Sequence, residues 1–146
     1  MVYRSYKKSE IANMLLETAL DLYFSRGDGF SIIHLAAAAE EVLSGLLNKK
    51  NENAIGPHYT TRERTISTLK EIHAIHDSER SRREISDFLN YVNNKTKHHN
   101  AVSDSDEITA CLELEIDSVL SRAIENYFLY FETLTEKMLR YINHMS

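Results

Sequence analysis

Residues 31–50 read SIIHLAAAAEEVLSGLLNKK, an apolar segment with four consecutive alanines. Alanine has the highest helix propensity of the amino acids, and its small side chain lets a neighbouring helix approach closely. The segment therefore predicts a central helix, capped by Ser31 and ending near Lys50. Glu40 and Glu41 fall inside it, and a carboxylate facing the core needs an Arg, a Lys or a helix end as partner. We expect structural pairing rather than acid–base chemistry at these two residues.

Residues that break secondary structure are scarce in this chain, whose 146 residues include four Gly and one Pro. A many-stranded sandwich or barrel needs more turns than this, so the scarcity predicts helices joined by a few loops. With 42% hydrophobic residues, the chain can fill one core without disulfides or a structural metal. We expect an all-α fold, a single up-and-down bundle of about five helices in one domain over residues 1–146.

Periodic apolar residues mark the helices around the central one. The spacing predicts a first helix with Ser9 as N-cap and Gly27 as its stop. A third helix is expected to begin near Thr60 or Thr61, and a fourth to end in the polar run 93–100. Both are shorter and more polar than the first two.

A single apolar stripe at steps of three and four predicts a long C-terminal helix. Its members are Ile108, Leu112, Ile116, Val119, Ala123, Tyr127, Phe131, Leu134 and Met138. Unbroken, about 35 residues would extend about 50 Å, which exceeds the width of a domain of this size. The helix must therefore bend, break or pack against a partner chain, and we expect a homodimer.

The net charge of −5 is unevenly distributed. Residues 1–57 carry a balance of −1, residues 58–99 carry +2, and residues 100–146 carry −6. Affinity for phosphate backbones rests on clustered cations, so only a local patch in the middle of the chain is suited to nucleic acid.

Three features predict a cytoplasmic protein with no membrane association. No apolar leader follows Met1, and the longest uncharged run, residues 29–39, is shorter than the roughly 20 residues that cross a bilayer. The single Cys111 forms no internal bridge and no cysteine-based zinc cluster, which fits a reducing compartment.

The histidines offer one candidate metal site. His73 and His76 are three residues apart with Asp77 adjacent, a spacing that metal sites use, but a centre needs a further ligand such as His58. We favour the interpretation that these are polar residues at a helix end over the interpretation that they form a metal site. Since no nucleotide-binding glycine loop, nucleophile elbow or His-Glu-X-X-His motif occurs, no cofactor or metal is expected.

The run Asn93-Asn94-Lys95-Thr96-Lys97-His98-His99-Asn100 gathers amides, lysines and histidines at a helix-to-loop junction. It is either an anion site or a solvated helix terminus. The order of an early helix, the alanine-rich Leu35–Leu43 segment, this run and a long final helix containing Ala123–Tyr127 resembles the HEPN-like helical domains of prokaryotes. The resemblance covers roughly residues 11–134.

The resemblance implies a bundle of about four to five helices that is usually a dimer. Many HEPN domains are metal-independent ribonucleases in toxin–antitoxin, CRISPR-linked and phage-defence systems, while others only bind nucleotides, RNA or protein partners. Their catalytic motif is an Arg, often followed by a polar residue, and then a His after four to six intervening positions. On this pattern His98 matches the acid–base His and Asn94 the polar position, whereas Asn93 stands where the family has Arg.

The missing Arg bears on catalysis, because cations must hold the phosphate while a group near neutral pKa moves protons. Lys95 or Lys97 supplies the charge on this hypothesis, without the planar fork of Arg, and His99 is a further candidate. We therefore favour a non-catalytic dimer that binds RNA, a nucleotide or an antitoxin-type protein partner. The alternatives are a metal-independent endoribonuclease using His98 and a metal-dependent helical enzyme at His73 and His76.

Overall fold

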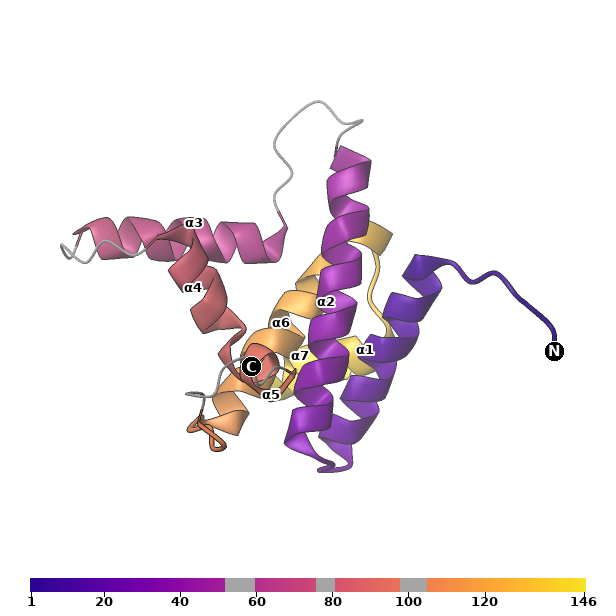
Figure 1. The fold of residues 1–146 in the computed structure, drawn as a ribbon. Coiled ribbons are helices and arrows are strands. Elements are labelled where there is room, and N and C mark those ends of the chain that lie inside the picture. Colours follow the sequence, from indigo (N-terminus) through magenta and orange to yellow (C-terminus); the bar gives the residue numbers. More distant parts are fainter. Residues whose placement is uncertain (52–59, 76–80, 98–104) are drawn as a thin grey trace.

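The computed structural model describes residues 1–51, 60–75, 81–97 and 105–146. These residues form helices without any strand, which confirms the all-α prediction (Figure 1). The helices are α1 (Lys8–Phe24), α2 (Gly29–Asn51), α3 (Thr61–Ile75), α4 (Arg82–Leu89), α5 (Tyr91–Lys97), α6 (Leu112–Phe131) and α7 (Glu136–Met145). The described part of the chain thus has seven helices rather than about five, because two predicted helices are each split.

The predicted central helix is confirmed as α2, which packs against α1 on one side and α6 on the other (Figure 1). Ala36, Ala37 and Ala39 are buried in the main core, where small side chains allow the close approach of neighbouring helices. The main core also contains buried residues of α1, α5, α6 and α7. Ile66 of α3 and Ile85 of α4 are buried outside it.

The start of α2 differs from the prediction. Asp28, and not Ser31, caps this helix: the backbone N–H of Ser31 donates to Asp28 Oδ2 at 2.8 Å, and the Ser31 hydroxyl donates to the same atom at 2.5 Å. The Asp28 carboxylate therefore accepts from the N–H of the third helical residue, and Asp28 takes the N-cap role that the sequence pattern assigned to Ser31. Likewise α1 begins at Lys8 rather than after Ser9, while Gly27 follows its end as expected.

The C-terminal stripe is interrupted at Glu132, which adopts the left-handed conformation with φ 57° after the end of α6. The chain turns there, and α7 begins after the N-cap Thr135. Every member of the stripe is buried or partly buried within one chain. The break therefore resolves the excess length without a partner. The start was also predicted too early, since α6 begins at Leu112.

The predicted fourth helix is split at Asn90 into α4 and α5. At this residue φ is −115°, outside the helical range, and the Asn90 side chain donates to the Ser86 carbonyl at 3.2 Å. The turn lets α5 pack Val92 into the main core while α4 stays with α3 at the side of the bundle (Figure 1).

One helix, α2, contains a stretch (residues 29–50) that is long and apolar enough to cross a membrane by length and composition alone. The sequence prediction considered only the shorter run 29–39. In this structure 44% of the apolar window is buried inside the protein, against α1 and α6. The predictions on membrane association and location stay predictions.

Candidate functional site

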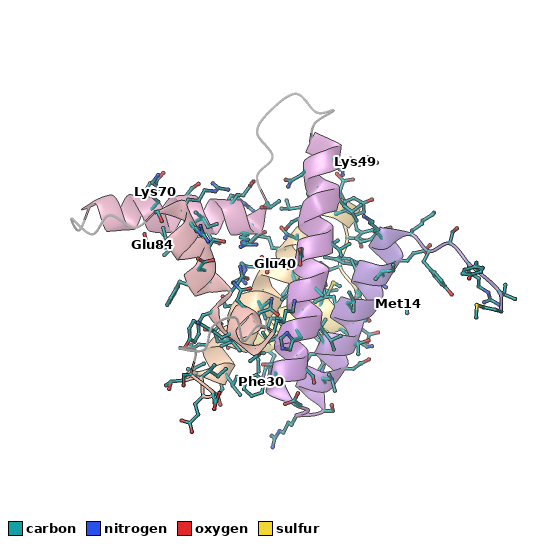
Figure 2. All side chains as sticks on the ribbon, viewed as in Figure 1. Met14, Phe30, Glu40, Lys49, Lys70 and Glu84 are labelled. Atoms are coloured by element: carbon teal, nitrogen blue, oxygen red, sulfur yellow. The ribbon has the colours of Figure 1, made fainter. Side chains whose placement is uncertain are left out.

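A polar cleft of about 660 Å³ lies between α2 on one side and α3, α4 and α5 on the other. Figure 2 shows Glu40 on the side of α2 that faces α4. The charged and amide side chains that line the cleft are Glu40, Glu41, Asn48, Arg62, Glu63, Arg82, Arg83, Asn90, Asn93 and Asn94. The cleft thus combines three guanidinium groups with several amides.

The three arginines differ in their partners. Arg82 lies 3.4 Å from Glu63, and Arg83 lies 3.9 Å from Asp87 on the next turn of α4. Arg62 instead donates from Nη2 to the Ser86 hydroxyl, and among the described residues it contacts no carboxylate. Within the described ranges, no carboxylate compensates the positive charge of this guanidinium at the cleft wall.

Glu40 forms a buried ion pair with Arg122 of α6 at the base of the cleft. Arg122 Nε donates to Oε1 of Glu40 at 2.9 Å, and Nη2 donates to Oε2 at 3.2 Å. The remaining donors of Arg122 reach the Ser118 hydroxyl at 2.6 Å and the Leu89 carbonyl at 3.4 Å. The prediction that a buried glutamate is structurally paired is confirmed, while Glu41 is exposed.

A second buried polar residue, Asn126 of α6, fixes the start of α3 at the edge of the cleft. Its Oδ1 accepts from the backbone N–H of Thr61 at 3.0 Å, and its Nδ2 donates to the Ser44 hydroxyl at 3.0 Å. Asn126 thus ties the first turn of α3 to both long helices of the core.

Two of the predicted site residues, Asn93 and Asn94, line the cleft on α5. Asn93 is half-buried and Asn94 is exposed, and both line the same cleft as the arginines. Lys95 and Lys97 are exposed on α5 and are not among the residues lining the cleft. His98 and His99 lie outside the described residues, so their predicted roles stay predictions.

The side chain of Asn93 is already engaged by His34 of α2. Its Oδ1 lies 2.8 Å from His34 Nδ1, and since an amide oxygen only accepts, that ring nitrogen donates. The other ring nitrogen, Nε2, lies 2.9 Å from the Thr96 hydroxyl. His34 therefore joins α2 to α5 through both of its nitrogens.

The candidate metal ligands are not placed by this structure. His58, His76 and Asp77 lie outside the described residues, and the side chain of His73 does too. Over the described ranges there is no group of three His, Cys, Asp or Glu side chains arranged to hold a metal ion.

Sequence reasoning missed several residues of this region, among them His34, Arg122 and the cleft arginines Arg62, Arg82 and Arg83. The positive balance of residues 58–99 was a signal for Arg62. Comparison with protein-family models, with curated proteins and with solved structures finds no match for this chain.

Proposed function

We propose that this chain is a non-catalytic, HEPN-like homodimer that binds a phosphate-bearing ligand in the polar cleft. This ligand is a nucleotide or an RNA segment. The proposal rests on one observation: the Arg62 guanidinium lies at the cleft wall and has no carboxylate partner among the described residues. Such a group binds phosphate oxygens through two parallel hydrogen bonds.

The surrounding charges favour an anionic ligand. Arg122 compensates Glu40, and Arg82 offsets Glu63, so two of the three carboxylates that line the cleft already have a cation. Arg83 lies at the long distance of 3.9 Å from its exposed partner, a contact of little energetic value. Arg62 and Arg83 are therefore the cations available to a phosphate.

The amides support binding more than catalysis. The exposed amide of Asn94 is suited to donate to a phosphate oxygen, whereas the oxygen of Asn93 is occupied by His34. No histidine is among the side chains that line the described part of the cleft, and its one buried carboxylate, Glu40, is held by Arg122. Cleavage by His98 and an antitoxin-type partner stay predictions of the resemblance.

The direct test is fluorescence anisotropy with a labelled single-stranded RNA, in EDTA, with a nucleoside triphosphate as competitor. Arg62→Ala removes a charge-assisted hydrogen bond worth about 1.5–3 kcal/mol, so affinity should fall about 10- to 100-fold. Removing one phosphate-binding cation should also reduce the slope of log affinity against log salt by about 0.7 for a single strand. Arg62→Lys should recover only part of the affinity, because lysine has no fork.

Lys70→Ala is the matched control, a cation exposed on the same helix but outside the cleft (Figure 2). An equal fall in affinity in Lys70→Ala and Arg62→Ala, or no binding by the wild type, would contradict the proposal. RNA cleavage in EDTA that His98→Ala abolishes would support the endoribonuclease instead. Activity or thermal stabilisation that requires a divalent metal would support the metal-dependent enzyme.

A further inference from the structure

A second, largely apolar groove of about 550 Å³ runs between α1 and α2. It is lined by Lys8, Ile11, Glu41, Val42, Gly45, Leu46 and Lys49. Glu41 also lines the polar cleft, so the two hollows adjoin along α2. Along α2, the apolar residues Val42 and Leu46 lie between the charged residues Glu41 and Lys49.

Gly45 is unusual for its position, since it lies well inside a 23-residue helix. Glycine there destabilises a helix by about 0.5–1 kcal/mol relative to alanine. A Cβ atom at Gly45 would meet nothing within 4 Å, so the packing of this chain gives no reason for the glycine. The bare backbone instead leaves room for another helix to approach closely.

The charges around Gly45 are self-complementary. Glu41 and Lys49 lie four residues before and after it, about 6 Å each way along the helix axis, and all three are exposed. If two copies of α2 cross antiparallel at Gly45, Glu41 of each copy is level with Lys49 of the other. A parallel crossing would place like charges together. Glu41 has no hydrogen-bond or ion-pair partner among the described residues, so it is available for this contact.

We infer that the α1–α2 groove is the interface of a two-fold symmetric homodimer, in which the α2 helices cross antiparallel at Gly45. Such an interface is isologous, because the same patch of each copy contacts its counterpart. The inference rests on the homodimer of the proposed function and assigns it a surface. It also places the two polar clefts beside the interface, through the shared residue Glu41.

The segment before α1 offers additional contact area. It joins the helix at Lys8, which lines the groove, and it extends away from its own bundle (Figure 1). Tyr3 is 91% exposed and Tyr6 is 66% exposed. Stable interfaces bury about 800 Å² per partner and are enriched in tyrosine, so these side chains are suited to add area to the contact.

The first experiment measures mass by light scattering at micromolar concentration. We expect the wild type to be a dimer and Gly45→Leu to be a monomer, because the leucine side chain holds the two helices apart. Gly45→Leu should remain folded by circular dichroism, since its side chain points into open space. Glu41→Lys should weaken the dimer, and the double variant Glu41→Lys/Lys49→Glu should restore it. A dimer unaffected by Gly45→Leu would overturn the assignment of the surface.

The second experiment locates the contact by disulfide cross-linking. In a Cys111→Ser background, Gly45→Cys should give a covalent dimer on oxidation, because a two-fold crossing at this residue brings the two sulfur atoms together. Ser121→Cys is the matched control, an exposed position on α6 in a different, apolar groove. Cross-linking through Ser121→Cys alone would place the interface on α6 and α7 and overturn the inference.

Failure here is distinguishable from failure of the proposed function. RNA binding by a monomeric Gly45→Leu variant would support the cleft, whereas a wild-type dimer that binds no RNA would uphold the interface alone. A monomeric wild type would overturn the interface whatever it binds. If that monomer sediments with vesicles of zwitterionic and anionic lipids, the groove is a lipid-binding face.

Discussion

Arg122 and Glu40 lie 82 residues apart in the sequence and meet in the core through two hydrogen bonds, of 2.9 and 3.2 Å. Both side chains are nearly inaccessible, with exposed fractions of 6% and 5%. The pair joins α6 to α2, the two helices that form the centre of the bundle, at the base of the polar cleft. Its geometry therefore links the stability of the core to the shape of the candidate site.

Breaking this pair should be costly, because a single substitution leaves one buried charge without its partner. We expect Glu40→Gln or Arg122→Leu to reduce the free energy of unfolding by about 3–5 kcal/mol, as measured with urea. The double variant Glu40→Leu/Arg122→Met should lie within about 1 kcal/mol of the wild type, because both charges are gone. Arg83→Ala, which breaks an exposed pair, is the control and should cost less than about 0.5 kcal/mol. A single variant no costlier than Arg83→Ala would contradict this prediction.

The contact between Asn126 and Thr61 should control the order of α3. Asn126→Leu leaves the Thr61 N–H without its acceptor, at a cost of about 1–3 kcal/mol. Hydrogen exchange should then accelerate in α3 more than in α1, because the hydrogen bonds of this side chain within the described residues go to Thr61 and Ser44. Ser44→Ala serves as the comparison, since it removes only the hydroxyl that Asn126 donates to. Unchanged protection of α3 in Asn126→Leu would show that this helix is held by other contacts.

The His34 contacts should hold α5 against α2. Thr96→Val removes the hydroxyl at His34 Nε2 and should cost about 0.5–1.5 kcal/mol, with faster hydrogen exchange in α5. Thr96→Ser keeps the hydroxyl and should behave like the wild type. In a double-mutant cycle, Thr96→Val should cost less in a His34→Ala background, because its partner is already gone. Additive effects of the two substitutions would rule out the contact.

The buried hydroxyl of Tyr141 should make the folded protein less stable at alkaline pH. Burial raises the pKa of its hydroxyl above the ordinary value of 10.0, and that hydroxyl donates to Asp117 Oδ1 at 3.2 Å. Above about pH 10 the unfolded chain loses this proton while the folded protein keeps it, so the free energy of unfolding falls as the pH rises. Tyr141→Phe should cost about 1 kcal/mol at neutral pH and should flatten the alkaline fall. Part of the fall should remain, because burial also raises the pKa of Tyr23 and Tyr127. Urea unfolding at about pH 8 and about pH 11 measures both effects, and an equally steep fall in Tyr141→Phe would contradict the assignment.

The fold was predictable where one helix dominates its neighbourhood. The alanines of α2 predicted a central helix correctly, because propensity and close packing agree there. The caps were less predictable, since Asp28 and Ser31 are both good acceptors and only the backbone geometry selects between them. The left-handed turn falls at Glu132, where no glycine marks it in the sequence. The sequence therefore indicated that the long helix breaks but not at which residue.

The site was predictable only in part. The need for a partner of Glu40 follows from the cost of a buried charge, but the choice of Arg122 requires the packing of α2 on α6. Arg122 lies three residues after Val119 on the apolar stripe, and that position was the missed signal. The contact of His34 with Asn93 joins residues 59 apart, a separation that helical periodicity does not address.

The two walls of the polar cleft differ in how much of each belongs to the main core. The α2 wall is part of the main core, and on the opposite wall α5 contributes Val92 to it. In contrast, no described residue of α3 or α4 belongs to that core, and Ile66 and Ile85 are buried apart from it. The α3–α4 wall should therefore open locally at lower free energy than the rest of the fold. A ligand that bridges both walls binds the state in which the α3–α4 wall is closed. Its apparent affinity is therefore the intrinsic affinity multiplied by the fraction of molecules in that closed state. Tethering α3 to α6 would raise the closed fraction and with it the apparent affinity for the ligand.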